Sequence, residues 1–453
     1  MKKANHNYWR ICGILSIAIC SGLLVGYVTA IIAGALPLLT KQFNLDDLNQ
    51  GFLVAIILIG GFTGSLICGK VTAPFGHKKA LLLMSGIFIL GSIWSAMSPN
   101  FWSLILARFC AGIAVGMCTV ISPMYVAETA PDSLRGFLVG SVQLAITIGI
   151  LGAYIVSYYF VESKNWPMMF ELAVLPALVL FLVTLTQFES PRWLLLNNRI
   201  VEANDIFFKL HGYHWTENKK APHSHNVVST KALLNPILLP AILFASGLFL
   251  FQNLSGIDAI LYYAPSIFQQ SGFLGLEGGL KIAILVGVIN IIATLLSMYL
   301  LDSLGRRPVL IFGLFIMAVS LLGFSASQLL LSEYPFMKWF SLFMLLSFVA
   351  SFASSMGPIP YVIMSELFPL HLRNTGMGIA SATSWGINAF ITFAYPLLES
   401  HLGISWIFAG FSLICVIACL ISIIFCPETQ GQSLESIEAR LYAGVGLRKI
   451  GKS

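Results

Sequence analysis

Amide and carboxylate side chains interrupt one of the chain's long apolar segments. The stretch FQNLSGIDAILYYAPSIF, residues 251–268, contains Gln252, Asn253 and Asp258 together with paired tyrosines. Amides both donate and accept hydrogen bonds, so they can match the hydroxyl groups of a ligand, while apolar surfaces beside them take its C–H faces. A polar group inside an apolar segment costs free energy unless it meets a partner or water. The stretch therefore has to face either a neighbouring helix or a polar cavity.

Other apolar segments carry similar interruptions. Gln143 lies in QLAITIG and Asn290 in GVINIIATLL, while Ser384, Trp385 and Asn388 lie in SATSWGINAF. Each of these side chains alone could serve only a hydrogen bond between helices. Together with the stretch above they favour a polar cavity, because several separate segments contribute to it.

The elements that position these groups are predicted to be membrane-spanning helices. The chain has 453 residues, of which 57% are hydrophobic and 10% charged, and its mean hydropathy is +0.87. Soluble domains are about 25% charged, and apolar runs of about 20 residues can cross a bilayer. We expect an all-α polytopic membrane protein with twelve transmembrane helices in two six-helix bundles. The predicted helices are residues 11–39, 51–69, 80–97, 102–124, 137–160, 168–187, 237–270, 280–301, 308–331, 338–364, 375–398 and 404–426.

Four regions follow from this pattern. Residues 1–188 are expected to form the N-terminal bundle and residues 237–426 the C-terminal one. Residues 189–236 read as a cytoplasmic linker with short amphipathic helices, and residues 427–453 as a cytoplasmic tail.

The distribution of basic residues predicts the orientation. Of 25 Lys and Arg, only Lys41, Lys164, Lys281 and Lys338 fall in loops on one side, while nearly all the others lie in the tails or in the loops of the opposite side. The positive-inside rule places both termini in the cytoplasm, and short loops suggest a bacterial inner membrane. The net charge of +6 then reflects topology, so no nucleic-acid partner is expected. Neither the eight cysteines nor the histidines have metal-ligand spacing, so we expect no metal or cofactor.

The two halves of the chain resemble each other. The stretch SPMYVAETAPDSLRG pairs Glu128 with Arg135, and IPYVIMSELFPLHLRNTG pairs Glu366 with Arg373, seven residues apart in both cases. Such internal repeats are typical of transporters that move two bundles about a central site.

Three motifs resemble those of the sugar porter family of the major facilitator superfamily. PMYVAETAP followed by Arg135 and Gly136, ESPRWL, and PETQGQSLESIE occur in the family's order, and the resemblance covers essentially the whole chain. It implies transport of a monosaccharide by alternating access. A sugar sensor of this fold would usually carry a long tail, and a membrane enzyme would need a catalytic cluster; the sequence offers neither.

The resemblance also assigns charged residues at the cytoplasmic ends of the helices. Their ion pairs would latch the two bundles in the outward-open state, although ordinary interfacial charge is the alternative. Ala73 and His77 stand where the family has Asp and Arg, which predicts a weaker N-terminal latch. The predicted latch residues are Glu128, Arg135, Glu189, Arg192, Asp302, Arg306, Arg307, Glu366, Arg373 and Glu428.

The resemblance implies that Gln252 forms hydrogen bonds with the hydroxyl groups of the sugar. Asn253 replaces a second Gln of the family's pattern, Asp258 replaces an Asn, and Tyr361 in GPIPY replaces a Trp that would cover the sugar ring. The predicted substrate-binding residues are Gln143, Gln252, Asn253, Asp258, Asn290, Tyr361, Ser384, Trp385 and Asn388.

Coupling to protons depends on the stretch GLLVGYVTAIIAGAL, residues 22–36, which resembles the family's first helix. Val28 stands where proton-coupled members have an Asp that looks like their proton site, near an Arg that this chain retains as Arg108. A buried Arg108 needs an acceptor. Glu171 is the candidate, although related symporters place a Glu two positions later, at Ala173; backbone carbonyls and water are the alternative.

Two hypotheses on coupling follow. Loss of the titratable group at Val28 favours a uniporter for a hexose or pentose. In the alternative, Asp258 is the proton site of a sugar or polyol/inositol symporter, because burial disfavours a charged carboxylate. We also expect Tyr27 and the glycines of residues 22–36 to line a cavity, and the protein to act as a monomer.

Overall fold

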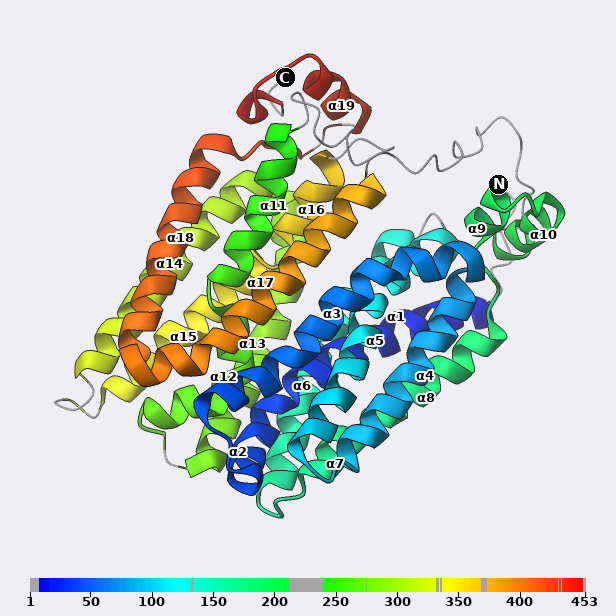
Figure 1. Cartoon of the computed structure of the whole chain (residues 1–453). Helices are drawn as coiled ribbons and strands as arrows, with labels where there is room; N and C mark the ends of the chain where they lie inside the picture. The colour runs from blue at the N-terminus through cyan, green and yellow to red at the C-terminus, as the bar shows by residue number, and fades with distance from the viewer. Residues whose placement is uncertain are drawn as a thin grey trace. The chain divides into compact units, whose positions relative to one another are not determined.

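The computed structural model describes a helical protein. It describes residues 8–131, 134–211, 239–273, 275–330, 334, 336–367, 373–430, 432 and 434–450, and within these ranges every regular element is a helix (Figure 1). Eleven segments of the described chain are long and apolar enough to cross a membrane. Helix α17 (Arg373–Leu402) occupies the remaining predicted position, residues 375–398.

The helices form two compact units. The first comprises Met1–Ile31, Ile56–Val156 and Asn165–Val227, and the second Ile32–Ala55, Ser157–Lys164 and Val228–Ser453. The helices of the first half of the chain are α1 (Tyr8–Ala30), α2 (Ile32–Phe43), α3 (Asp47–Phe75), α4 (His77–Ala96), α5 (Phe101–Thr129), α6 (Arg135–Val161), α7 (Trp166–Glu171), α8 (Val174–Thr186), α9 (Pro191–Leu196) and α10 (Ile200–His211). They are followed by α11 (Leu239–Leu254), α12 (Ile257–Gln270), α13 (Gly275–Leu304), α14 (Arg306–Leu330), α15 (Met337–Ser354), α16 (Ile359–Leu367), α17, α18 (Ile404–Phe425), α19 (Leu434–Tyr442) and the 3-10 turn η2 (Leu447–Lys449).

Four predicted spans are broken into two helices each. The breaks fall at Ile31, at Leu172–Ala173, at Ser255–Gly256 and between Ser354 and Ile359. Gly256 has φ of +85°, a conformation that glycine adopts without steric cost. The break it makes places Asp258 in the first turn of α12.

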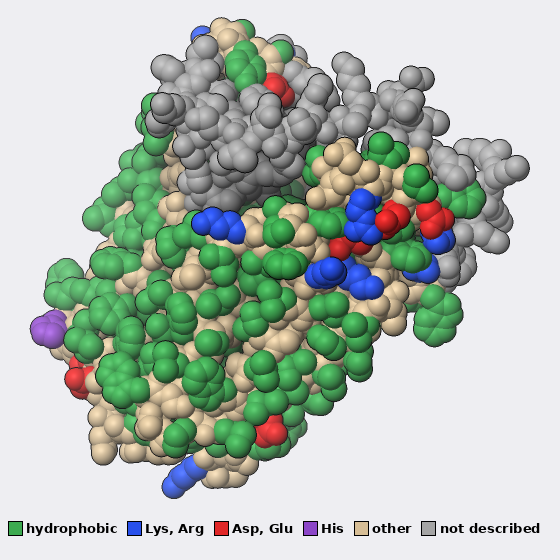
Figure 2. Space-filling view, turned by 45° about the vertical axis from the view of Figure 1, so that its right-hand side comes forward, with side chains coloured by type: hydrophobic (Ala, Val, Ile, Leu, Met, Phe, Trp, Pro, Cys, Tyr) green, Lys and Arg blue, Asp and Glu red, His purple; other side chains and the backbone are tan. Residues whose placement is uncertain are grey.

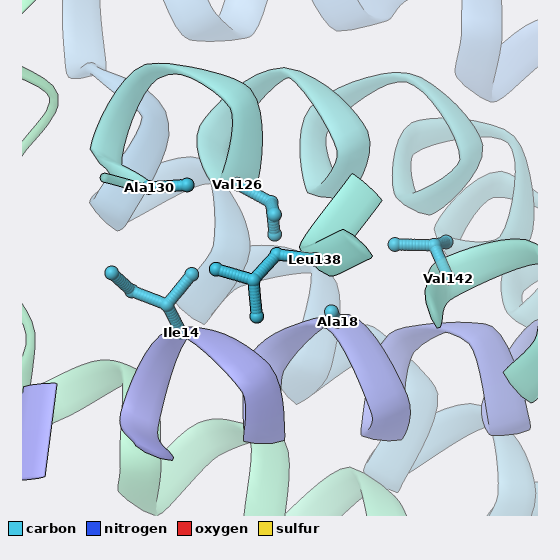
Figure 3. Close-up of a cluster of buried hydrophobic side chains, with 6 residues drawn as sticks. All are labelled: Ile14, Ala18, Val126, Ala130, Leu138 and Val142. Atoms are coloured by element: carbon cyan, nitrogen blue, oxygen red, sulfur yellow. The ribbon is translucent and has the colours of Figure 1, made fainter. Parts of the chain in front are cut away.

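One buried apolar cluster of the first unit is formed by residues of α1, α5 and α6. Figure 3 shows Ile14 and Ala18 of α1 facing residues from the other two helices. All six side chains of this cluster are buried, so it holds α1 against the unit. The cluster consists of Ile14, Ala18, Val126, Ala130, Leu138 and Val142.

Glycines of α1 pack against α6, which corrects the expectation that they line a cavity. A Cβ atom at Gly26 would lie 2.0 Å from the carbonyl oxygen of Ile146, and one at Gly22 would lie 2.4 Å from that of Val142. Small residues allow membrane helices to approach this closely. The glycines therefore serve helix packing, whereas Tyr27 on the same helix does line a cavity.

Replacing Gly26 with alanine should destabilise the protein. The new methyl group would overlap the backbone of α6, so the helices must separate, and overpacking of this kind costs about 1–3 kcal/mol. We expect the Tm of the purified protein to fall by roughly 2–6 °C. Gly152→Ala in α6 is the matched control, because a Cβ there has no neighbour within 4 Å. Equal melting of the two variants would contradict this packing.

The second unit contains its own apolar and polar contacts. Phe249 and Ala245 of α11 pack with Met364 of α16. Between α14 and α18, the hydroxyl of Ser325 donates a 2.8 Å hydrogen bond to the carbonyl oxygen of Ser405. Hydroxyls bonded in this way can be buried between membrane helices without leaving an unsatisfied group.

The described surface is strongly apolar. Figure 2 shows a broad face covered by hydrophobic side chains with few charged ones among them. Exposed residues such as Leu90, Phe312 and Leu413 lie in the middle of long helices. An apolar surface of this extent fits contact with lipid rather than water.

Candidate functional site

Arg108 is a buried cation in the first unit. It lies in α5 and only 1% of it is exposed. The carbon at the centre of its guanidinium group lies 5.6 Å from the centre of the Phe170 ring. A cavity of about 10 Å³ adjoins it, with Ser92, Ser95 and Tyr27 among the lining residues. The hydroxyl of Tyr27 donates a 2.7 Å hydrogen bond to the carbonyl oxygen of Met169.

Two positions singled out by the sequence line the same cavity. Val28 comes from α1, and Ala173 lies at the break between α7 and α8. Both are apolar, and of the ten described residues that line the cavity Arg108 carries the only charge. Glu171, the predicted acceptor for Arg108, is exposed and is not among the lining residues. The structure therefore brings Val28 and Ala173 to Arg108, and leaves Glu171 outside.

The predicted sugar-binding amides of α11 make hydrogen bonds within the second unit. Nε2 of Gln252 donates to the carbonyl oxygens of Met356 (2.9 Å) and Gly357 (3.0 Å), where the chain breaks between α15 and α16. Nδ2 of Asn253 donates to the hydroxyl of Ser384 at 3.0 Å. These contacts orient both amides, and because a side-chain amide oxygen accepts two hydrogen bonds, Gln252 keeps an acceptor for a ligand.

Asp258 and Asn388 lie side by side in this unit. Their side chains form a hydrogen bond, and Asp258 lies in the first turn of α12, where the helix dipole favours a negative charge. Asn388 also accepts a 3.0 Å hydrogen bond from Thr392. Tyr361 is 48% exposed, and its ring packs edge-on against Phe249 with 4.8 Å between ring centres.

The remaining predicted ligand residues differ in exposure. Asn290 in α13 is 7% exposed, Trp385 in α17 is half-buried, and Gln143 in α6 is exposed. The sugar-binding role of all nine residues remains a prediction.

A charged cluster caps the start of α14. Gly305 has φ of +92°, and α14 begins at the next residue, Arg306. Glu428 accepts hydrogen bonds from the backbone N–H groups of Arg306 (3.1 Å) and Arg307 (3.0 Å). A carboxylate is favourable there because the first N–H groups of a helix lack partners within it. Nη2 of Arg306 also pairs with Glu366 at 3.1 Å.

The first unit repeats this arrangement at the start of α4. Gly76 has φ of +85°, and α4 begins at His77. Glu189 accepts hydrogen bonds from the backbone N–H groups of His77 (2.9 Å) and Lys78 (3.0 Å). The two halves thus share one arrangement: a glycine with positive φ precedes the helix, and a glutamate caps its first backbone N–H groups.

The two clusters differ in the cation that faces the second carboxylate. The hydroxyl of Ser190 donates a hydrogen bond to Glu128 in the first unit. The hydroxyl of Thr429 donates one to Glu366 in the second unit. Nδ1 of His77 lies 3.7 Å from Glu128, and histidine pairs with a carboxylate only when protonated. Arg306 occupies the equivalent place in the second unit and is always charged. The N-terminal cluster thus has a histidine where the second unit has an arginine, and its weakness as a latch stays a prediction.

The other predicted latch residues lie in different surroundings. Arg307 donates a 2.9 Å hydrogen bond to the carbonyl oxygen of Ile423, Arg192 is exposed and Arg135 is half-buried. The side chains of Asp302 and Arg373 lie outside the described residues. All of these latch-residue contacts join groups of the same unit, so latching between bundles remains a prediction.

Replacing His77 with arginine should strengthen the N-terminal cluster. An arginine would stay charged and pair with Glu128 wherever this carboxylate is ionised, as Arg306 does with Glu366. We expect a Tm increase of roughly 1–3 °C at pH 8, since a partly buried ion pair contributes about 1 kcal/mol. Lys79→Arg, which changes an exposed residue beside it, is the control. If His77→Arg melts like the parent protein, the proposed weakness of this cluster is wrong.

The chain has apolar spans, polar groups within these spans, and a glutamate cap at a helix start in each half. These features are typical of a polytopic membrane transporter. The family model described as sugar (and other) transporter matches residues 14–441, and the chain belongs to this family.

Curated relatives cover nearly the whole chain. It is 34% identical to a D-xylose transporter of Levilactobacillus brevis over 457 residues, with 98% of each chain covered. It is 32% identical to the galactose-proton symporter of Escherichia coli K12 over 459 residues, covering 99% of this chain and 98% of the relative.

Solved structures confirm the twelve-helix major facilitator fold. The proton:xylose symporter XylE, solved with bound 6-bromo-6-deoxy-D-glucose, matches with a TM-score of 0.79 at 30% identity, covering 96% of this chain and 99% of that one. A partially occluded inward-open form of XylE from Escherichia coli matches with a TM-score of 0.78 at 29% identity, covering 94% and 99%. The chain is therefore a multi-pass sugar transporter and not an enzyme.

Proposed function

We propose that this protein carries a pentose or hexose across the membrane by facilitated diffusion, in an alternating-access cycle. The polar side chains of α11, α12 and α17 support a sugar site, because they present amide, hydroxyl and carboxylate groups within one unit. Relatives named as D-xylose and galactose transporters make both sugar classes reasonable substrates.

The observation that carries passive transport is the lining of the Arg108 cavity. A proton symporter needs a group that binds and releases a proton during the cycle, and arginine does not release one. Val28 and Ala173, the two positions at which the family resemblance implies carboxylates, face this cavity as apolar side chains. Without a carboxyl or imidazole group among the described lining residues, this cavity has no group suited to carrying a proton with the sugar.

The second candidate function is proton-coupled transport of a sugar, polyol or inositol through Asp258. The hydrogen bond between Asp258 and Asn388 favours this alternative, because it places a carboxyl group among the predicted sugar-binding residues. Protonation of Asp258 would then alter the site directly. Since relatives include a galactose-proton symporter, coupling by another residue is chemically reasonable.

Uptake under an imposed pH gradient separates the two functions. Proteoliposomes containing the purified protein are given labelled D-xylose or D-galactose, with and without a gradient that is acidic outside. A uniporter exchanges label in counterflow and equilibrates it to equal concentrations in both conditions. Accumulation above equilibrium that is abolished by a protonophore would overturn facilitated diffusion. Absence of counterflow for both sugars would shift the proposed substrate class toward polyols.

The remaining assignments complete the proposal. The protein is a monomer in a bacterial inner membrane with both termini in the cytoplasm, as the bias of Lys and Arg suggests. Residues 1–188 and 237–426 form the two moving bundles, joined by residues 189–236. The clusters around Glu189 and Glu428 then lie at the cytoplasmic ends of the bundles, where they can contribute to the closed gate.

A further inference from the structure

The cavity beside Arg108 combines a buried positive charge with hydroxyl groups. Arg108 is 1% exposed, and Ser92, 4% exposed, lines the cavity with it. A fully buried guanidinium is stabilised by any opposite charge brought next to it. A serine hydroxyl can rotate to donate a hydrogen bond to an anion. The walls therefore supply both the charge and the donor that anion binding needs.

The size of the cavity selects among anions. Its volume of about 10 Å³ admits one particle of about the size of a water molecule. A single halide ion is of this order, whereas sulfate or phosphate has four oxygens around a central atom and is too large. Apolar Val28 and Ala173 form part of the wall, and the ring of Phe170 covers another part. Such walls exclude most water, which strengthens the attraction between an anion and Arg108.

We propose that this cavity binds one small monovalent anion, chloride in the cell, between the guanidinium of Arg108 and the hydroxyl of Ser92. The bound anion takes the place that a carboxylate side chain at position 28 or 173 would fill. It remains with the protein through the transport cycle and is not the transported substrate. Its removal lowers the stability of the first unit, whichever sugar the protein carries.

Thermal unfolding in different salts tests the site without relying on transport. The purified protein is melted in 150 mM sodium chloride, bromide or gluconate at constant pH. We expect a Tm on the order of 2 °C higher in chloride and bromide than in gluconate, because a bound ligand stabilises the folded state. Equal Tm values in all three salts would overturn the proposal.

Two substitutions at Val28 separate this site from other halide effects. Val28→Asp places a carboxylate in the cavity, so the difference between chloride and gluconate should disappear. Val28→Asn has nearly the same shape without the charge and should keep the difference. If Val28→Asp retains the full difference, the halide acts elsewhere and the proposal is wrong. Should either variant fail to fold, Ala173→Glu and Ala173→Gln make the same comparison from the opposite wall of the cavity.

Bromide also gives a direct view of the site. Crystals of the wild-type protein grown in sodium bromide should show an anomalous diffraction peak between Arg108 and Ser92. A cavity without such a peak, in crystals that diffract well enough to show bromide elsewhere, would mean that water fills it.

Discussion

Replacing Val28 with aspartate is expected to convert passive uptake into uptake driven by a pH gradient. The new carboxyl group would share a cavity with Arg108 and could bind and release a proton as the cavity opens to each side. With one proton per sugar, a gradient of one pH unit can sustain about tenfold accumulation, because each unit corresponds to about 1.4 kcal/mol. Labelled D-xylose or D-galactose uptake into proteoliposomes measures this ratio.

The matched control is Val28→Asn, which adds a polar group of the same shape without a titratable proton. It should equilibrate sugar without accumulation, like the wild-type protein. If Val28→Asp folds and exchanges sugar but never accumulates it, then position 28 alone does not decide coupling. If the wild-type protein already accumulates sugar, facilitated diffusion is contradicted whatever the variant does.

Removing the amide of Gln252 should weaken sugar transport strongly. The side chain is held by the carbonyl oxygens of Met356 and Gly357, so its remaining acceptor is fixed in place for a ligand. Loss of hydrogen bonds in a buried site costs about 1–3 kcal/mol. We therefore expect Gln252→Ala to raise the KM for sugar counterflow by roughly 5- to 150-fold.

A half-buried amide elsewhere in the same unit provides the control. Gln328 donates hydrogen bonds to the hydroxyls of Ser271 and Ser341, both at 3.1 Å, and belongs to none of the predicted sugar-binding positions. Gln328→Ala should lower stability to a similar degree while leaving KM within about twofold of the wild-type value. A similar rise in KM for both variants would show that Gln252 acts through the packing of the unit and not through the sugar.

Composition and periodicity were sufficient to predict the class of fold. Apolar runs of membrane length placed each of the twelve spans, because a bilayer constrains helix length more strongly than water does. The helix breaks were harder to predict. Gly256 marks one of them in the sequence. Pro176 marks another, because it has no backbone N–H to bond the carbonyl oxygen of Leu172 four residues earlier. The break at Ile31 contains no proline or glycine.

The side chains around Arg108 show the limit of inference from spacing. The sequence relates Val28 to Arg108 and predicts Glu171 as the acceptor, because Glu171 is a charged residue near the start of the sixth predicted span. The break after α7 instead turns Ala173 into the cavity and leaves Glu171 exposed. A local kink changes which residue faces inward, and periodicity along a straight helix does not predict it.

The sequence predicts the two capping glutamates as charged residues but does not predict what they cap. Motif resemblance picked out Glu189 and Glu428 as charged latch residues, but their contacts with the backbone at the starts of α4 and α14 depend on segments more than 100 residues away. Positive φ at Gly76 and Gly305 allows these close contacts. The glycine before each basic pair was the one available signal.

A sugar-induced pH change in wild-type vesicles shows whether sugar moves with or without a proton. De-energised vesicles in weak buffer are mixed with D-xylose or D-galactose while external pH is recorded. We expect no change in pH although labelled sugar enters, and we expect Asp258→Asn to remain active. Alkalinisation outside the vesicles on addition of sugar would contradict the account, and loss of that signal in Asp258→Asn would assign the proton to Asp258.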